Sequence, residues 1–216
     1  MKYITRFFTR VRRPRELLFT LIMAGLLLVV AIISGSATRP LTVTWQDRLG
    51  FAPSDLFSGY WERMFTSALV TSGGLGFWLP YGAMIGLISI AEWLTGTRRT
   101  ALAFWLSHLG ACVGEAVFTG LAIQFFNSTM LNNVHSLRDV GPSAGYFGCI
   151  GAITAHIPRP WRYLVGVAII AALVGGMIVS AQRGATVEVT AGLAHLLAFP
   201  IGWSVAAGTF LKRPRA

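Results

Sequence analysis

Repeated apolar segments, most of them long enough to cross a lipid bilayer, constrain this chain more than any other feature. A helix rises about 1.5 Å per residue, so about 20 apolar residues cross the hydrocarbon core of roughly 30 Å. Short polar or Gly- and Pro-containing stretches separate the segments. The pattern predicts an all-α membrane protein, a bundle of six transmembrane helices over residues 17–33, 75–94, 101–126, 143–157, 162–181 and 187–210.

The composition agrees with a membrane protein of one domain. Only 12% of the 216 residues are charged, against about 25% in soluble domains. The mean hydropathy is +0.63. We expect a basic cytoplasmic or interfacial N-terminus over residues 1–16, the six-helix domain over 17–211 and a basic cytoplasmic tail over 212–216.

The basic residues predict the orientation in the membrane. The net charge is +10, but the Lys and Arg residues cluster beside the apolar segments, which favours interaction with the lipid bilayer rather than with nucleic acid. With the N-terminus inside, thirteen basic residues fall on cytoplasmic segments and five on outer ones. We therefore expect both termini in the cytoplasm. Few lysines together with abundant Ala and Gly are typical of a GC-rich bacterial genome, and we expect the membrane to be a bacterial inner membrane.

Two features of the chain allow more than one interpretation. Residues 17–33 could form the core of a secretory signal followed by small residues at 35–37, but the run is longer than usual, and we favour a retained first helix. The connection over residues 35–67 is long for so small a protein and is either functional or packs at the membrane interface.

The two cysteines, Cys112 and Cys149, lie in apolar segments and indicate neither a disulfide nor a metal site.

Ser143 and His195 are the polar side chains with the strongest indication of function. The segment that begins at Ser143 has fifteen residues, or about 22 Å of helix, so its outer end should lie roughly 8 Å below the outer surface. His195 lies six residues after Val189, or about 9 Å deep on the last helix. The two depths agree, and polar groups inside a membrane mark a candidate site.

Small residues predict that these two helices touch. Ala144, Gly148 and Ala152 recur every four residues on one helix, and a stripe of the same kind runs next to His195 on the other (Ala194, Ala198, Gly202 and Ala206). Small residues at this spacing let membrane helices approach closely.

A serine and a histidine in contact can perform acyl transfer. The imidazole takes the hydroxyl proton, and the unpaired N–H groups at the helix start stabilise negative charge, with Gly141 and Ala144 forming the turn around Ser143. No acidic residue is placed to orient His195, so the arrangement would be a dyad, without a cofactor or a metal. The alternative is a helix-capping serine and a core histidine bonded to backbone.

The order of several motifs resembles the rhomboid family of intramembrane serine proteases. Gly141-Pro142-Ser143-Ala144 is similar to the Gly-x-Ser-Gly motif on the family's fourth helix, and Ala194-His195 to its sixth-helix histidine. The resemblance places Phe147 under that histidine, with Gly145 in a supporting position. The stretch 61–67 is similar to a Trp-Arg-x-x-Thr motif, and Glu92 followed by Gly96 to the end of the second helix.

The resemblance implies a six-helix rhomboid-like fold and cleavage of transmembrane segments of other membrane proteins. The sequence also departs from the family. Gly76 and Pro80 occupy the second-helix positions where relatives carry the His and Asn of the oxyanion hole, and Ala144 replaces a glycine. Because losing one oxyanion donor costs about 10²–10³ in rate, the alternative is a weak or inactive rhomboid-like protein that binds membrane-protein partners as a scaffold or subunit.

His108 and Glu115 suggest a third hypothesis. They lie seven residues apart on one face of the third helix, and a proton-linked carrier could use such groups together with His195. The simpler interpretation is a locally bonded pair of polar core residues. Asn132, Asn133 and His135 precede Ser143 in the chain and are interpreted as solvated or as cover for the site.

Overall fold

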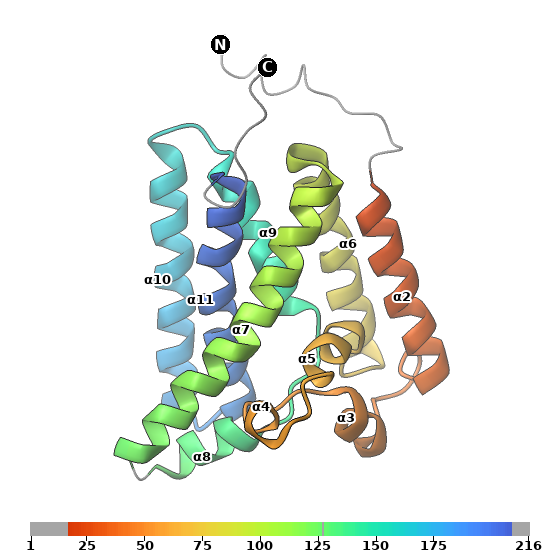
Figure 1. The fold of residues 1–216 in the computed structure, drawn as a ribbon, viewed down its shortest axis with the longest axis vertical. Coiled ribbons are helices and arrows are strands. Elements are labelled where there is room, and N and C mark those ends of the chain that lie inside the picture. The colour runs from red at the N-terminus through yellow and green to blue at the C-terminus, as the bar shows by residue number, and fades with distance from the viewer. Residues whose placement is uncertain (1–16, 127, 209–216) are drawn as a thin grey trace.

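The computed structural model describes residues 17–126 and 128–208, and over these residues the chain forms helices and no strand. The predicted all-α class is confirmed. The predicted terminal segments 1–16 and 212–216 lie outside the described residues. Six apolar helices stand side by side, and α7 crosses the bundle obliquely (Figure 1). They are α2 (Leu18–Ser34), α6 (Leu75–Thr95), α7 (Thr97–Phe125), α9 (Ser143–Ala155), α10 (Trp161–Gln182) and α11 (Thr186–Ala206).

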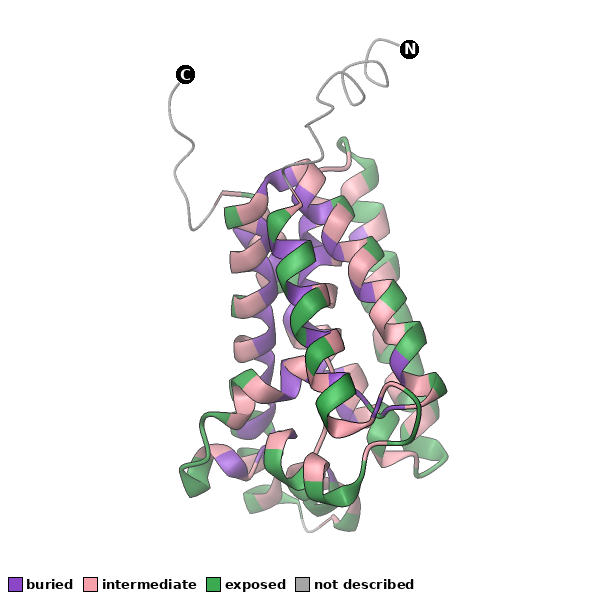
Figure 2. Cartoon of the chain, turned by 90° about the vertical axis from the view of Figure 1, so that its right-hand side faces the viewer, coloured by how far each residue is buried: buried purple, intermediate pink, exposed green. Residues whose placement is uncertain are grey.

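Four of these helices, α6, α7, α10 and α11, are long and apolar enough to cross a membrane. The other two are shorter, with 17 residues in α2 and 13 in α9. The outward sides of the helices carry most of their exposed residues, and the buried residues face the interior (Figure 2). This arrangement suits a bundle surrounded by lipid.

Three predicted boundaries are wrong, and one of them is the end of α11, which stops at Ala206, four residues before the predicted 210. Residues 97–100 belong to α7, and only Gly96 separates α6 from α7. The hydroxyls of Thr97 and Thr100 are bonded to Glu92 and Thr95, so the first turn of α7 accommodates these polar residues. Helix α9 ends at Ala155, two residues earlier than predicted. Pro158 follows closely, and the residue before a proline is restricted away from helical backbone angles.

Glu92 ties three helices together. Its side chain is fully buried and accepts hydrogen bonds from the Phe19 and Thr20 N–H groups at 2.9 and 2.8 Å, and from the Thr20 hydroxyl at 2.8 Å. The Thr97 hydroxyl at the start of α7 donates to it at 2.6 Å. Because these donors include the first turn of α2, that helix is bonded into the bundle.

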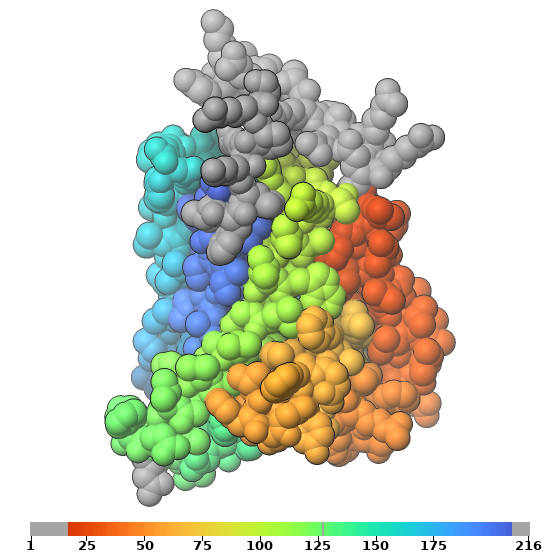
Figure 3. Space-filling model, in the orientation of Figure 1, coloured from red at the N-terminus to blue at the C-terminus, as the bar shows by residue number. Residues whose placement is uncertain are grey.

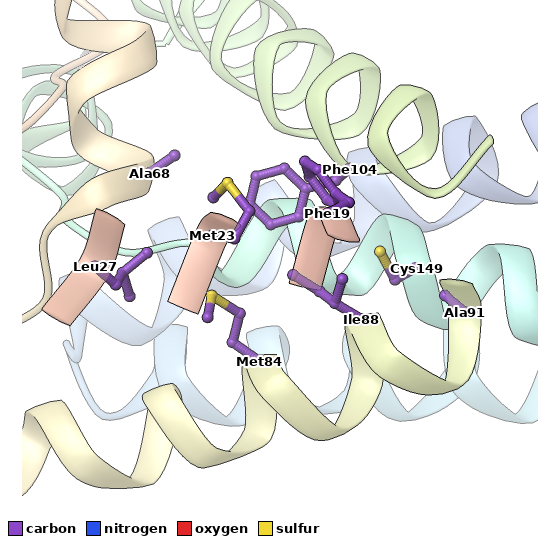
Figure 4. Packing of buried hydrophobic residues seen from close by; sticks show 9 residues of the cluster. All are labelled: Phe19, Met23, Leu27, Ala68, Met84, Ile88, Ala91, Phe104 and Cys149. Carbon is purple, nitrogen blue, oxygen red and sulfur yellow. The ribbon is translucent and has the colours of Figure 1, made fainter. Parts of the chain in front are cut away.

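The main apolar core lies where α2, α6, α7 and α9 meet. Phe19 packs edge-on against Phe104, with ring centroids 5.6 Å apart. Cys149 is fully buried in this cluster as a free thiol, as predicted for a packing residue. Figure 4 shows the nine residues of the cluster: Phe19, Met23, Leu27, Ala68, Met84, Ile88, Ala91, Phe104 and Cys149.

Short helices gather at one end of the bundle (Figure 1). They are α3 (Val43–Leu49), α4 (Asp55–Ser58), α5 (Arg63–Thr66), η2 (Ser67–Leu69) and α8 (Thr129–Ser136). Figure 3 shows the segment with α3 to α5 covering the lower part of the bundle beside α7. The buried carboxylate of Asp55 bonds Arg63 at 2.8 Å and Arg138 at 2.9 Å, which joins the 35–67 connection to the segment before α9.

Candidate functional site

The turn that presents Ser143 is held by neighbouring backbone. Phe51 and Asp139 exchange two N–H to carbonyl hydrogen bonds of 3.0 and 2.8 Å. The Gly141 N–H donates to the Ser67 carbonyl at 2.9 Å. Gly141 has φ 146°, an angle that residues with a side chain rarely adopt. These contacts fix where the chain enters α9.

Ser143 is the first residue of α9, and the helix has no side-chain cap. Its first N–H groups therefore lack intrahelical partners and carry the positive end of the helix dipole. The Ser143 hydroxyl is partly exposed and makes no hydrogen bond to any residue that the structure describes. The interpretation of Ser143 as a capping side chain is therefore not supported, because no cap bond forms.

Helices α9 and α11 pack backbone against backbone, which confirms the predicted contact. A Cβ atom on Gly202 would overlap the Gly148 carbonyl, and one on Gly151 would overlap the Phe199 carbonyl. Nearer the start of α9, Ala144 packs with Ala194 and other alanines of α7 and α11. The small residues therefore bring the helices of Ser143 and His195 into direct contact.

His195 lies against the first turns of α9. Its ring stacks on Phe147 with centroids 3.8 Å apart and planes 9° from parallel. Phe147 follows Ser143 by four residues, about one helical turn. The Nε2 atom of His195 is buried and has no hydrogen-bond partner among residues 17–126 and 128–208. The structure places both side chains at one helix contact, without a hydrogen bond between them.

The other predicted residues take packing positions. Gly145 lies so close to the Phe104 ring that a Cβ atom would overlap it. Ala144 is buried. Gly76 lies in the first turn of α6 beside Ser72, and Pro80 lies inside that helix. Neither of these two α6 residues lines the cavity at Ser143.

A small polar cavity adjoins Ser143. Its volume is about 20 Å³, and a single water molecule needs at least about 10–15 Å³. The buried His108 and Glu115 of α7 line it, and each has one side-chain atom without a partner among the described residues. His108 bonds Ser67 rather than Glu115, so the expected local pair is wrong. The lining residues are Phe51, Ser67, His108, Ala111, Cys112, Glu115, Asp139, Val140, Gly141, Ser143, Ala144 and Ala194.

Asp139 adds an acidic group to this cavity. Burial raises the pKa of Asp139 from its usual 3.8 to about 6, although the hydrogen bond from the Val140 N–H opposes the change. Ser67 and Asp139 were not predicted as site residues, because both lie in connections outside the apolar segments. Asn132 and Asn133 are exposed on α8, as expected for solvated residues. His135 bonds Thr119 at 2.8 Å.

The described residues thus define an all-helical bundle with four helices suited to cross a membrane and a polar cavity at the start of α9. Comparison of the chain with protein-family models, with curated proteins and with solved structures finds no match.

Proposed function

We propose that this chain is a rhomboid-like intramembrane serine endopeptidase with six transmembrane helices and both termini in the cytoplasm, in the inner membrane of a bacterium. The observation that supports this function best is the stack of His195 on Phe147, one turn from Ser143, across the close contact of α9 with α11. The substrates are transmembrane segments of other membrane proteins.

The proposed reaction needs only these two side chains and water. The Ser143 oxygen attacks the peptide carbonyl carbon while its proton moves to a His195 ring nitrogen. The C–N bond then breaks, and the leaving amine takes that proton, which leaves an acyl group on Ser143. Water attacks this ester, passes a proton to His195, and the proton returns to the Ser143 oxygen as the new carboxylic acid departs.

The burial of the site supports hydrolysis inside a membrane. Ser143 begins the short helix α9 within the bundle, where its free N–H groups can stabilise the negative oxygen. The adjoining cavity has polar side chains in its lining and room for a water molecule. His195 presents a ring nitrogen that has no competing partner in the described part of the chain.

Labelling with a fluorophosphonate tests the proposal. In this reaction the Ser143 oxygen bonds phosphorus, fluoride leaves, and His195 takes the hydroxyl proton. We expect the purified chain in detergent to be labelled, Ser143→Ala to be unlabelled, and His195→Ala to label at least about 100-fold more slowly. Ser136→Ala removes an exposed hydroxyl on α8 and is the matched control, expected to label like wild type. Equal labelling of wild type and Ser143→Ala would overturn the proposal.

A scaffold that binds transmembrane segments without cleaving them is the second candidate. Two observations favour it. Ser143 and His195 form no hydrogen bond with each other, and Gly76 and Pro80 stand where the resemblance would place the two oxyanion-hole donors. This candidate predicts no Ser143-dependent label under conditions that label a known serine hydrolase. It also predicts that wild type and Ser143→Ala retain the same membrane-protein partners.

A further inference from the structure

His108 on α7 is a buried polar side chain to which the proposed hydrolysis assigns no function. It is 3% exposed, and its ring stacks with Phe104 at a centroid distance of 6.4 Å. The Nε2 atom lies 3.2 Å from the Ser67 hydroxyl. The Nδ1 atom is buried and has no hydrogen-bond partner among the described residues. Buried polar atoms without a partner are uncommon and call for a functional explanation.

Several contacts place His108 beside Ser143. Both side chains line the same cavity. Ser67 links them, because its hydroxyl contacts His108 and its carbonyl accepts the Gly141 N–H at 2.9 Å, two residues before Ser143. Ala111, about one turn further along α7, packs in the same cluster as Ala144. The His108 ring is therefore anchored to the turn from which α9 begins.

The Nε2 atom faces two possible donors, the Ser67 hydroxyl at 3.2 Å and the Cys112 thiol at 3.9 Å. The other acceptor near the Ser67 hydroxyl, the Met64 carbonyl, is at 3.5 Å and is the weaker partner. When Ser67 donates to Nε2, the neutral imidazole carries its proton on Nδ1. Nδ1–H is then a buried donor without a hydrogen-bond partner among the described residues, on a side chain that lines the cavity at Ser143.

We propose that His108 Nδ1–H donates a hydrogen bond to the substrate carbonyl oxygen while Ser143 adds to the carbonyl carbon, which makes His108 a third catalytic residue. As the bond to Ser143 forms, the electron pair of the C=O bond moves to that oxygen, and it returns when the C–N bond breaks. His108 transfers no proton and keeps its charge. This inference rests on the proposed function. His108 on α7 would stabilise the negative carbonyl oxygen, which the first turn of α6 does not do.

Two substitutions of His108 distinguish the roles of its two ring nitrogens. Asparagine places an amide near the position of Nδ1 but is too short to reach Ser67, whereas glutamine reaches the position of Nε2 and keeps the Ser67 contact. We expect the second-order rate of fluorophosphonate labelling at Ser143 to fall about 100-fold in His108→Gln, and less than about tenfold in His108→Asn. Ser107→Ala on α7 is the control, because its buried hydroxyl does not line the cavity, and should label within twofold of wild type.

The unfolding temperature of each variant, measured in the same detergent, separates catalysis from structure. The inference is supported if His108→Gln unfolds within a few degrees of wild type and still labels slowly. It is overturned if both His108 variants label at equal rates, or if labelling falls only in step with the unfolding temperature. A wild type that shows no Ser143-dependent label overturns the proposed function itself, and the inference with it.

Discussion

At the scale of single residues, Phe147 is the side chain that gives His195 its position. The parallel stack at 3.8 Å fixes the plane of the imidazole, so the ring can turn only with difficulty. Stacking shields one ring face, and the partner-free Nε2 is left at the ring edge. The Ser143 hydroxyl, one turn before Phe147 on α9, has no hydrogen bond to a described residue that would hold its side chain in one rotamer.

Asp139 should make stability depend on pH. Its pKa is about 6 in the folded chain and near 3.8 when unfolded, so the folded state binds the proton more tightly. The stability from this proton is fully present below pH 3.8 and is lost as pH rises to 6. Asp139→Asn stays neutral and can still accept from Val140 N–H. We expect its stability advantage over wild type to grow between pH 4 and pH 7, by at most about 3 kcal/mol.

Unfolding in detergent at pH 4 and at pH 7 checks this prediction. Asp47→Asn is the matched control, since the Asp47 side chain is 64% exposed, and it should follow wild type at both values. A gap between Asp139→Asn and wild type that is the same at the two pH values would contradict the burial argument.

The sequence predicted some residues of the site and missed others for a physical reason. Ser143 and His195 could be predicted as neighbours because both lie in apolar helices. The rise per residue then gives each of them an expected depth below the outer membrane surface. The contact of Ser67 with His108 joins residues 41 apart, and Ser67 lies in η2, which has too few residues to show a periodic pattern. A polar residue within an apolar segment was the signal for His108, but its partner could not be read from the chain.

At the scale of elements, the contact of α9 with α11 determines the geometry of the site. Gly148 and Gly202 bring the two backbones together, and neither position has room for a side chain. Such contacts replace the hydrophobic effect as the source of helix association inside lipid. Any change in this contact should move Ser143 relative to His195.

Gly202→Ala tests this helix contact. The added methyl group would overlap the Gly148 carbonyl, so the helices must separate, at a cost of about 1–3 kcal/mol. Labelling of Ser143 should slow as well. Gly175→Ala on α10 is the matched control, because nothing lies within 4 Å of its added Cβ, and a helical Gly→Ala change is neutral or stabilising by up to about 1 kcal/mol. Equal unfolding temperatures for the two variants would show that the contact is looser than described.

The long helices were predictable and the short ones were not. Apolar length alone located the six bundle helices, with errors at the start of α7 and at the ends of α9 and α11. The segments α3, α4 and α5 have 7, 4 and 4 residues, too few for a hydrophobic period. They depend on long-range contacts such as the Asp55 ion pair with Arg138, 83 residues away.

At the scale of the whole molecule, the distribution of basic residues predicts the orientation. Thirteen Lys and Arg residues on the proposed cytoplasmic segments against five on the outer ones favour both termini inside. A periplasm-dependent phosphatase fused after Ala216 should therefore be inactive, and one inserted at Gly184, between α10 and α11, should be active.

Fusions of a protein that fluoresces only in the cytoplasm should give the opposite pattern at the same two positions. An active phosphatase at the C-terminus would contradict the proposed orientation and the depth argument that pairs Ser143 with His195. It would leave the contact of α9 with α11 unaffected, because that contact follows from the described packing alone.

The carboxylate of Glu92 also has a consequence for the order of assembly. Its backbone donor at Phe19 is 73 residues earlier in the chain, so the first turn of α2 is synthesised long before its acceptor. Until α6 is complete, those N–H groups lack this acceptor. The start of α2 can therefore reach its final position only after residue 92 has been synthesised, and the Thr97 hydroxyl then completes the junction.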